Sequence, residues 1–317
     1  MSEKAYEKEK IVTVIGSLNF DLIFKQKRLA EIGETYTADR LETAGGGKGA
    51  NQAVQCAKLG TTTYLVGAVG NDVLGEKLVH DLKHYGVHTE YIGRAAETTG
   101  VGVVNALEDG TLIATISKGA NYSLTKERID EIEDLLMRSA IVILQLEVPV
   151  DVVEYAIRKA HDFGCYIILN AAPAAPVAPD ALAKVSCLVV NESEASFYCG
   201  KPIHDLASAQ LHGHGLYERT GELLIITLGK SGCVVFDREG SFYVPAEPVN
   251  AIETTGAGDS FIGAFATRML ESPDVKAATR FASRAAAVTV TKIGAQSAMP
   301  TIQQLQADVS SDSQPMV

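Results

Sequence analysis

Long apolar runs, disulfide patterns and an export signal are all missing from the sequence. No apolar stretch reaches the roughly 20 residues that a membrane-spanning helix needs. The first residues, MSEKAYEKEK, are charged and do not contain the apolar segment of a signal peptide. The five cysteines are scattered along 317 residues without a C-x-x-C pair, which argues against a disulfide framework or a zinc site. We therefore expect a cytoplasmic protein that does not bind a membrane.

Positive charge is also scarce. The chain has 28 lysine and arginine residues against 39 acidic residues, a formal net charge of −11, and no basic run. An acidic surface repels polyanions, so we expect no nucleic-acid partner. A small phosphorylated ligand remains compatible with this charge, because a few backbone N–H groups can hold it locally.

Apolar residues, by contrast, are abundant and make up 46% of the chain. This content suits one large domain with a buried core. We expect that domain to span residues 1–306 and the polar segment 307–317 to be a disordered tail.

Short apolar runs alternate with helical stretches over most of the chain. The runs are unbroken rather than alternating, which indicates strands buried on both faces. We predict such strands at 11–16, 62–70, 140–146, 165–170, 187–190 and 223–229. Helical patterns lie between them at 75–86, 125–139 and 150–164. This succession predicts an α/β fold with a mostly parallel central sheet and helices on both faces.

Two regions, about 18–46 and 98–118, alternate apolar and polar residues instead. The second contains VGVVNALEDGTLIATIS, with Asp109-Gly110 placed for a hairpin turn. We predict that both regions form a small antiparallel sheet that covers the edge of the main sheet as a lid. Because lid strands present open edges, we also predict a homodimer formed through them.

The segment ETTGAGDSFIGAF, residues 253–265, combines small residues with one acid. If a helix begins here, Gly256, Ala257 and Gly258 place backbone N–H groups at its positive end, which suits a bound anion. Asp259 repels such an anion, but it can take a proton from an incoming hydroxyl group. The pattern therefore suggests phosphoryl transfer to an alcohol. The alternative is a glycine-rich helix start without a ligand.

A second glycine-rich segment, TAGGGKGANQAVQCAKLG, occupies residues 43–60. It is not a Walker A loop, because Lys48 is followed by glycine rather than by serine or threonine. It matches G-x-G-x-x-A, but the polar DRLETA before it is unlike the buried strand that a dinucleotide site requires. A better interpretation is that Gly47 lets a polar ligand approach the backbone while Lys48 and Asn51 bind its hydroxyl groups. The alternative is a plain glycine-rich loop with a solvated Lys48.

Together, GGGKGANQAV and TTGAGDSF resemble the two signatures of the ribokinase-like carbohydrate kinases, also called the phosphofructokinase-B family. The resemblance extends from about Ile11 to Pro300. It implies an ATP-dependent sugar kinase that uses Mg²⁺ and is activated by a monovalent cation, usually K⁺. Within that family we expect D-ribose as the substrate, phosphorylated at O5, with deoxyribose, a fructose-type sugar or adenosine as alternatives. A non-catalytic sugar sensor and a nicotinamide oxidoreductase are the alternatives from other classes.

The resemblance also implies roles for individual residues. GSLNFD, GGGKGAN and LQLEVP supply the expected sugar-binding residues Asn19, Asp21, Gly47, Lys48, Asn51 and Glu147. In TTGAGDSF, Asp259 takes the position of the base, and Gly256, Ala257 and Gly258 form the anion hole. The expected ATP-binding residues are Asn191, Glu194, Thr227, Leu228, Gly229, Lys230, Ser231, Gly232, Gly258 and Ser283. Glu194, in an N-x-x-E motif, is expected to order Mg²⁺ through water, and the expected K⁺ ligands are Glu253, Thr255, Thr289, Lys292, Gly294 and Ala298.

Two positions depart from the family pattern. Glu253 stands where family members typically have aspartate, which puts the affinity for the monovalent cation in question. Residues 170–173 read NAAP instead of the asparagine-proline-alanine-proline of many members. Neither change removes a residue of the expected chemistry.

Overall fold

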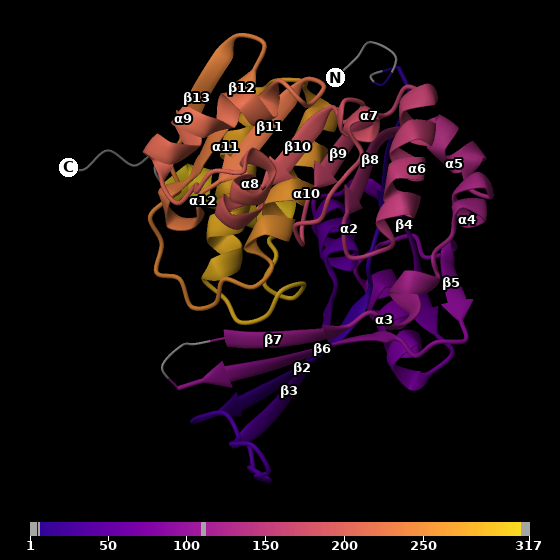
Figure 1. Ribbon diagram of the computed structural model, residues 1–317, viewed down its shortest axis with the longest axis vertical. Helices are drawn as coiled ribbons and strands as arrows, with labels where there is room; N and C mark the ends of the chain where they lie inside the picture. Colours follow the sequence, from indigo (N-terminus) through magenta and orange to yellow (C-terminus); the bar gives the residue numbers. More distant parts are fainter. Residues whose placement is uncertain (1–4, 6, 109–111, 312–317) are drawn as a thin grey trace.

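A large central sheet organises the molecule (Figure 1). The computed structural model describes residues 5, 7–108 and 112–311, and within this part nine strands form the sheet in the order β13-β12-β11-β10-β9-β8-β1-β4-β5. In chain order they are β1 (Glu9–Ile15), β4 (Thr62–Gly70), β5 (Ile92–Ala95), β8 (Ser139–Gln145), β9 (Tyr166–Asn170), β10 (Cys187–Val190), β11 (Leu223–Thr227), β12 (Cys233–Asp237) and β13 (Gly240–Val244). Neighbours from β5 to β11 pair in parallel, and β11, β12 and β13 pair antiparallel at one edge. The predicted α/β class with a mostly parallel sheet is confirmed.

The six strands predicted from unbroken apolar runs are the central ones. Every residue of β8 is buried, because helices cover both faces of the sheet at that position. The sequence pattern missed β5, β12 and β13, which lie at or near the sheet edges. In β13 only Val244 is fully buried, so its sequence GSFYV does not form an apolar run.

Helices cover both faces of the sheet, and each layer lies over its own hydrophobic core. Phe265 belongs to one core and Ile157 to the other, and both side chains are fully buried. One layer consists of α2 (Lys48–Lys58), α3 (Val73–His84), α10 (Ala257–Glu271), α11 (Val275–Val290) and α12 (Ile302–Ser311). The other consists of α4 (Lys126–Asp130), α5 (Glu133–Arg138), α6 (Val150–Asp162), α7 (Pro179–Leu182), α8 (Glu192–Cys199) and α9 (Leu206–Tyr217). Two short 3-10 helices, η1 (Gly119–Ser123) and η2 (Gly229–Ser231), lie in connections.

Two boundaries differ from the sequence prediction. The single helix expected over 125–139 is divided into α4 and α5, because Ile132 leaves the helical conformation (φ −109°, ψ 17°). Its N–H group donates to Ile129 O, which closes a tight turn between the two helices. The expected domain end at residue 306 lies inside α12, which continues to Ser311. The rest of the expected tail, 312–317, lies outside the described residues.

Four of the described strands form a smaller sheet that extends away from the large one (Figure 1). They are β2 (Asn19–Gln26), β3 (Arg40–Gly46), β6 (Gly100–Leu107) and β7 (Leu112–Ser117), in the order β3-β2-β6-β7, and we call this sheet the lid. The pairs β2–β3 and β6–β7 are antiparallel, as predicted, and β2 and β6 pair in parallel between them. The predicted turn at Asp109-Gly110 lies outside the described residues.

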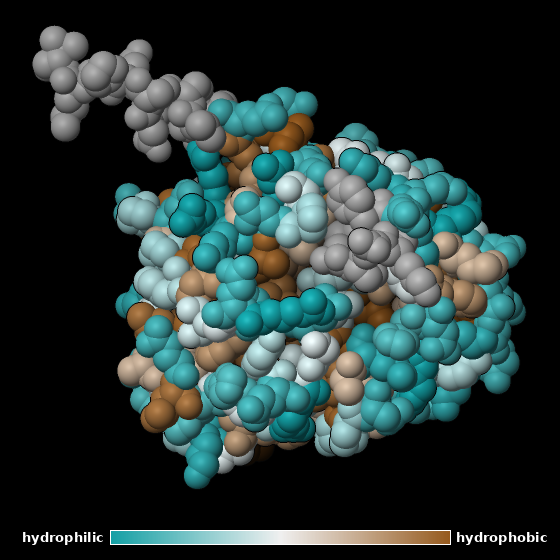
Figure 2. Space-filling view, turned by 90° about the horizontal axis from the view of Figure 1, so that it is seen from above, coloured by the Kyte–Doolittle hydropathy of each residue, from teal (hydrophilic) through white to brown (hydrophobic). Residues whose placement is uncertain are grey.

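One face of the molecule illustrates the character of the surface. Figure 2 shows a face that is mostly hydrophilic, with smaller hydrophobic areas between. Across residues 5, 7–108 and 112–311, no helix combines the length and the apolar character that a membrane crossing requires.

Candidate active site

The lid joins the large sheet at the carboxyl ends of the parallel strands. β1 continues through residues 16–18 into β2, and Gly47 alone separates β3 from α2. Gly47 has φ 86°, and a Cβ atom at this position would lie 2.7 Å from Asn19 N. Only glycine allows this conformation and this close crossing of the two segments. The start of α2 is thereby placed beside the end of β1.

Asp259 lies in the first turn of α10 and faces the first turn of α2. Its Oδ2 accepts a hydrogen bond from Asn51 Nδ2 at 2.9 Å, and its Oδ1 accepts one from Gln52 Nε2, also at 2.9 Å. The side chain of Asp259 is only 7% exposed. The two glycine-rich segments therefore meet at one carboxylate, although Asn51 and Asp259 are 208 positions apart in the chain.

Lys48 lies near the carboxyl groups of Asp259, Glu147 and Glu194. Burial raises the pKa of Asp259, and the Lys48 ammonium and the two amide donors oppose that rise. Burial alone would lower the pKa of Lys48, but the charges of Asp259, Glu147 and Glu194 together raise it. Lys48 is therefore a charged ammonium group, and it offsets part of the negative charge around it.

Glu147 follows β8 and closes the start of α2. Its Oε2 accepts hydrogen bonds from Lys48 N at 3.0 Å and from the Ser17 hydroxyl. Its Oε1 has no hydrogen-bond partner among the described residues. That oxygen is available to a ligand with a hydroxyl donor.

Asn19 is held by an asparagine that lies outside both signatures. Asn121, in η1, donates from Nδ2 to Asn19 Oδ1 at 2.8 Å, and its Oδ1 accepts from Leu18 N at 2.8 Å. Both asparagine side chains are buried. The sequence pattern singles out the stretch 118–123 as a segment near the sugar, but not Asn121 within it. The sequence feature that could have identified Asn121 is that it is the one amide side chain in the glycine-containing stretch KGANYS, residues 118–123.

Asp21, in β2, rests against two glycines of the neighbouring lid strands. A Cβ atom on Gly46 would lie 2.1 Å from Asp21 Oδ2, and one on Gly102 would lie 2.3 Å from Oδ1. Burial and, to a smaller extent, the nearby Glu147 carboxylate raise the pKa of Asp21 to about 7. Its carboxyl group makes no hydrogen bond within the described chain. It is therefore free to bind a hydroxylated ligand as a donor or as an acceptor.

The start of α10 presents unpaired backbone donors. Gly256 precedes the helix with φ 78°, and no side chain caps the helix. Ala257 N donates to Thr254 O at 3.3 Å, whereas the N–H groups of Gly256, Gly258 and Asp259 have no acceptor in the described part of the chain. A Cβ atom on Gly258 would meet no other atom within 4 Å. This open helix start suits an anion.

The expected nucleotide-binding residues lie at the ends of two neighbouring parallel strands. Asn191 follows β10, and Thr227 ends β11. Asn191 Oδ1 accepts from Glu194 N at 2.9 Å, while Glu194 Oε2 accepts from Asn191 N at 2.8 Å, so the two residues form a capping box at α8. Burial raises the pKa of Glu194. This carboxylate is already engaged at a helix start, so it suits a metal ion held through water better than one held directly.

The remaining nucleotide-binding candidates follow β11, with one exception. Leu228 is buried, and the exposed Lys230 and Ser231 lie in η2 between Gly229 and Gly232. Ser283 lies on α11, half-buried, and makes no hydrogen bond to these residues within the described structure.

The expected cation-binding residues come from the two segments that flank the start of α10, 253–255 and 289–298. Glu253 Oε2 accepts from Gly294 N at 3.1 Å, which joins the segments. The Thr289 hydroxyl lies within hydrogen-bond distance of Ser260 Oγ, at 2.8 Å, and of Ala285 O, at 2.9 Å. The other candidates, Thr255, Lys292 and Ala298, lie in the same two segments.

A lysine that sequence reasoning missed anchors the second of these segments. Lys58 Nζ donates to the backbone oxygens of Gln296 and Met299, both at 2.7 Å. Burial and the nearby Lys292 lower the pKa of Lys58 to about 8. Lys58 is the last residue of α2, so this helix contacts Asp259 at its start and the 289–298 segment at its end.

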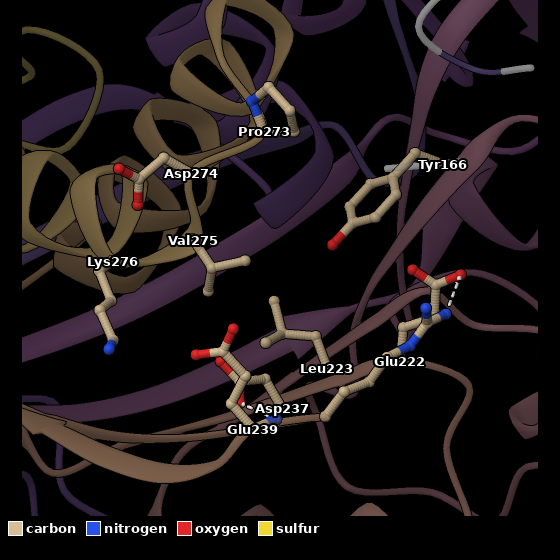
Figure 3. Close-up of a pocket in the computed structure, with 10 residues that line it drawn as sticks. Tyr166, Glu222, Leu223, Asp237, Glu239, Pro273, Asp274, Val275 and Lys276 are labelled. Carbon is tan, nitrogen blue, oxygen red and sulfur yellow. Dashed lines mark hydrogen bonds and ion pairs between the residues drawn. The ribbon is translucent and has the colours of Figure 1, made fainter. Parts of the chain in front are cut away.

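A cavity of about 620 Å³ lies at the opposite end of the large sheet (Figure 3). Tyr166 and Leu223, which begin β9 and β11, face Val275 at the start of α11 across it. The carboxylates of Asp237 and Glu239 line its rim. None of the described candidate residues borders this cavity, so the candidate active site is the open carboxyl edge of the sheet and not this cavity.

Known proteins share both the sequence pattern and the fold. The model of the pfkB family of carbohydrate kinases matches residues 9–302. A ribokinase from Haemophilus influenzae is 34% identical over 296 residues, which cover 93% of this chain and 97% of that protein. A deoxyribokinase from Salmonella typhi is 36% identical over 297 residues, which cover 92% and 96%. The solved structure of Arabidopsis thaliana ribokinase complexed with ribose and ATP superposes with a TM-score of 0.88 at 30% identity, covering 94% of this chain and 98% of that chain.

Proposed function

The chain belongs to the pfkB family of carbohydrate kinases, and on this premise we propose that it transfers the γ-phosphoryl group of ATP to O5 of D-ribose. The ribokinases among its relatives, and the fold that it shares with a ribokinase bound to ribose and ATP, support this substrate pair. The reaction is phosphoryl transfer from a nucleotide to an alcohol.

One observation carries the proposal: the Asp259 carboxylate lies beside unpaired N–H groups at the start of α10. Both oxygens of Asp259 accept hydrogen bonds from amides, which favours the ionised form. In that form Asp259 takes the proton of the O5 hydroxyl as it attacks the γ-phosphorus. The N–H groups of Gly256 and Gly258 offset the charge that develops on the transferred group.

The sugar is bound between the lid and the start of α2. Polar groups from both lie there, and we assign to this role Asn19, Asp21, Gly47, Lys48, Asn51 and Glu147. A site built from such groups rejects analogues that leave a buried polar atom unpaired. The lid excludes water, which would otherwise compete as the phosphoryl acceptor.

ATP binds along the ends of β10 and β11. The phosphates approach Asn191 and Gly258, and the segment from Thr227 to Gly232 borders the nucleotide with Ser283. A bound Mg²⁺ would supply charge neutralisation on the phosphates. Glu194 would hold it through water, because its carboxylate is already part of a capping box.

We assign the segments joined by Glu253 and Gly294 to an activating monovalent cation. Backbone oxygens, hydroxyl groups and one carboxylate are suitable ligands for such an ion, and the residues that we assign to it are Glu253, Thr255, Thr289, Lys292, Gly294 and Ala298. A bound K⁺ would supply positive charge next to the start of α10. The longer side chain of Glu253, in place of aspartate, is expected to change how much K⁺ is needed.

Deoxyribose is the second candidate substrate, because a deoxyribokinase is 36% identical to this chain. ADP release should be measured with D-ribose, deoxyribose, fructose and adenosine, each with and without K⁺. We expect the highest kcat/KM for D-ribose and a loss of rate without K⁺. A tenfold preference for deoxyribose or adenosine would overturn the choice of substrate, and the absence of ADP release with every acceptor would overturn the kinase activity.

Replacing the base gives the sharpest test of the chemistry. Asp259→Asn keeps the shape of the side chain but cannot accept the proton, so kcat should fall by about 10³-fold. Asp205→Asn is the matched control, because Asp205 caps α9 and asparagine is an equally good cap. The control should keep the parental rate. An Asp259→Asn enzyme with a rate close to the parental value would contradict the proposal.

We propose in addition that two copies associate through their lids. Leu41 of β3 and Ile116 of β7 are each 52% exposed on the two outer strands of the lid, where a second lid can cover them. Light scattering at micromolar concentration should give the mass of a dimer. A monomer at that concentration would contradict this assignment.

We also propose that the protein is cytoplasmic. All five cysteines are free, which supports a reducing compartment and therefore the cytoplasm. The net charge of −11 supports a small-molecule substrate and opposes a nucleic-acid or anionic-membrane partner.

A further inference from the structure

Two chains of buried amides converge on the Asp259 carboxylate. In the first, Gln145 Nε2 donates to Gln52 Oε1 at 2.6 Å, and Gln52 Nε2 donates to Asp259 Oδ1 at 2.9 Å. In the second, Gln296 Nε2 donates to Asn51 Oδ1 at 3.1 Å, and Asn51 Nδ2 donates to Asp259 Oδ2 at 2.9 Å. The four amide side chains are at most 6% exposed.

The carboxylate sets the orientation of every amide in the first chain. An ionised carboxylate only accepts hydrogen bonds, so Gln52 must present its NH₂ group to Asp259. Gln52 must then present its oxygen to Gln145, and Gln145 must turn its own NH₂ group toward Gln52. The oxygen of Gln145 is left over at the end of the chain.

That left-over oxygen is the unusual feature. Gln145 Oε1 is buried and has no hydrogen-bond partner among the described residues. It lies against Gly16, where an added Cβ atom would be 1.8 Å away. A buried acceptor without a donor destabilises a fold, and an apolar side chain of the same shape would avoid this cost. The side-chain amide of Gln145 makes one hydrogen bond within the described structure, to Gln52 Oε1, so a role for Gln145 beyond packing would act through Gln52.

We propose that Gln52 and Gln145 form a positioning relay for catalysis, in which Gln145 fixes the orientation of Gln52 and Gln52 holds the carboxylate of Asp259 as a proton acceptor. Asn170 supports that orientation, because its Oδ1 accepts from Gln52 Nε2 at 3.2 Å. This inference rests on the proposed sugar kinase activity. Neither glutamine touches the substrate in this scheme. Both act through Asp259.

The relay opposes protonation of Asp259 in the absence of substrate. Protonation would add an O–H donor to a carboxyl group whose two oxygens already face amide NH₂ groups, and Gln145, Asn170 and Gln296 hold those amides in place. The charged groups that act on Asp259 are Lys48 of α2, Glu147 after β8 and Glu194 of α8. Of these three charges, that of Lys48 favours the ionised form of Asp259. The hydrogen bonds from the two amides act in the same direction as Lys48.

Two variants test the relay, with a control on the same helix. Gln52→Met and Gln145→Met keep the length of the side chain and remove the amide. Gln55→Met is the matched control: Gln55 is equally buried on α2, and it donates to Pro300 O at 3.1 Å and accepts from Ser260 Oγ without touching Asp259. The readouts are the pH profile of kcat/KM for D-ribose and the melting temperature of each variant.

In Gln52→Met the acid limb of the pH profile should move up by about one pH unit, because one hydrogen bond to the charged form is lost. At pH 7 its kcat should fall about tenfold, with little change in KM. Gln145→Met should shift the acid limb in the same direction by a smaller amount, and its melting temperature should equal or exceed the parental value because the unpaired oxygen is gone. Gln55→Met should lose stability and keep the parental pH profile.

Gln52→Glu covers the case in which Gln52→Met does not fold. A carboxyl group at this position shares a proton with Asp259, so the acid limb should move by more than it does in Gln52→Met. Parental acid limbs in Gln145→Met and in whichever Gln52 variant folds would overturn the relay. An Asp259→Asn enzyme that stays active would instead overturn the proposed base, so the two failures are distinguishable.

Discussion

Two helices begin side by side at the carboxyl edge of the large sheet, and both begin in the same way. A glycine with positive φ precedes each helix, Gly47 at 86° before α2 and Gly256 at 78° before α10, and neither helix has a side-chain cap of its own. Both starts meet at the Asp259 carboxylate. The two glycines differ in ψ, which is 129° at Gly47 and −1° at Gly256.

The two starts differ in what becomes of their backbone donors. In α2, Lys48 N donates to Glu147, Gly49 N and Ala50 N donate to the hydroxyl and backbone oxygens of Ser17, and the next N–H bonds back to Gly47 O. In α10, Gly258 N and Asp259 N have no acceptor in the described part of the chain.

The difference shows which helix start is left for a ligand. An open helix N-terminus carries a partial positive charge that attracts an anion. At α2 the protein supplies that anion itself, as Glu147. At α10 the carboxylate in the first turn is that of Asp259, which faces α2, and the N–H groups of Gly258 and Asp259 receive no acceptor from the described residues. We infer that the phosphoryl group binds at α10 and that α2 serves the uncharged sugar.

The largest expected effect is a loss of stability from a substitution at the start of α2. Gly49 and Gly258 are both the second residue of their helices. A Cβ atom on Gly49 would lie 2.6 Å from Ser17 N and 2.7 Å from Gly16 C, both of which are backbone atoms that cannot yield. Gly49→Ala should therefore lower the free energy of unfolding by about 3 kcal/mol. Denaturant unfolding measures this, and a stable Gly49→Ala protein would show that the start of α2 is less tightly closed than we conclude.

Replacing glycine by alanine at the start of α10 should lower the activity without lowering the stability. A Cβ atom on Gly258 would meet nothing within 4 Å, and Gly258 does not have a positive φ. Gly258→Ala should keep or slightly raise the stability, by up to about 1 kcal/mol, because alanine favours a helix. It should also lower kcat about tenfold, because the methyl group enters the space assigned to the phosphoryl group. Full activity in Gly258→Ala would place the anion elsewhere.

How far the sequence predicts this arrangement depends on the kind of signal. The glycines before α2 and α10, and Asp259 after them, are visible because small residues and an acid stand at fixed positions in short segments. The central strands are visible because burial on both faces requires unbroken apolar runs. Both signals are local in the chain, and both identify the right elements.

The features that sequence reasoning missed depend on contacts between distant segments. Gln52 and Gln145 are ordinary glutamines until the fold brings them to Asp259. Lys58 looks like a solvated residue at a helix end, yet it bonds to the backbone oxygens of Gln296 and Met299. The open start of α10 is different, because the small residues before Asp259 already indicate it in the sequence.

The smallest expected effect connects the start of α2 with the lid through charge. Glu147, which closes α2, also acts on Asp21, whose pKa is raised to about 7 from an ordinary value of 3.8. Because the folded-state pKa lies above the unfolded value, the folded protein binds more protons than the unfolded chain between about pH 4 and pH 7. The free energy of unfolding should therefore fall across this range as the pH rises.

Asp21→Asn removes this titration, so its stability relative to the parent should grow as the pH rises through this range. At pH 8 we expect the variant to be more stable by about 1 kcal/mol, well below the full linkage value because Asp21 is partly exposed and solvent screens its charge. Glu147→Gln is the matched control: it keeps an acceptor for Lys48 N and removes the like charge, so its difference from the parent should follow the same trend with a smaller amplitude, because burial is the larger cause. Unfolding measured at pH 5, 6, 7 and 8, without sugar or nucleotide, compares the three proteins. A difference between Asp21→Asn and the parent that does not change with pH would mean that Asp21 is ionised throughout, and the lid would then offer the sugar a carboxylate and not a proton donor.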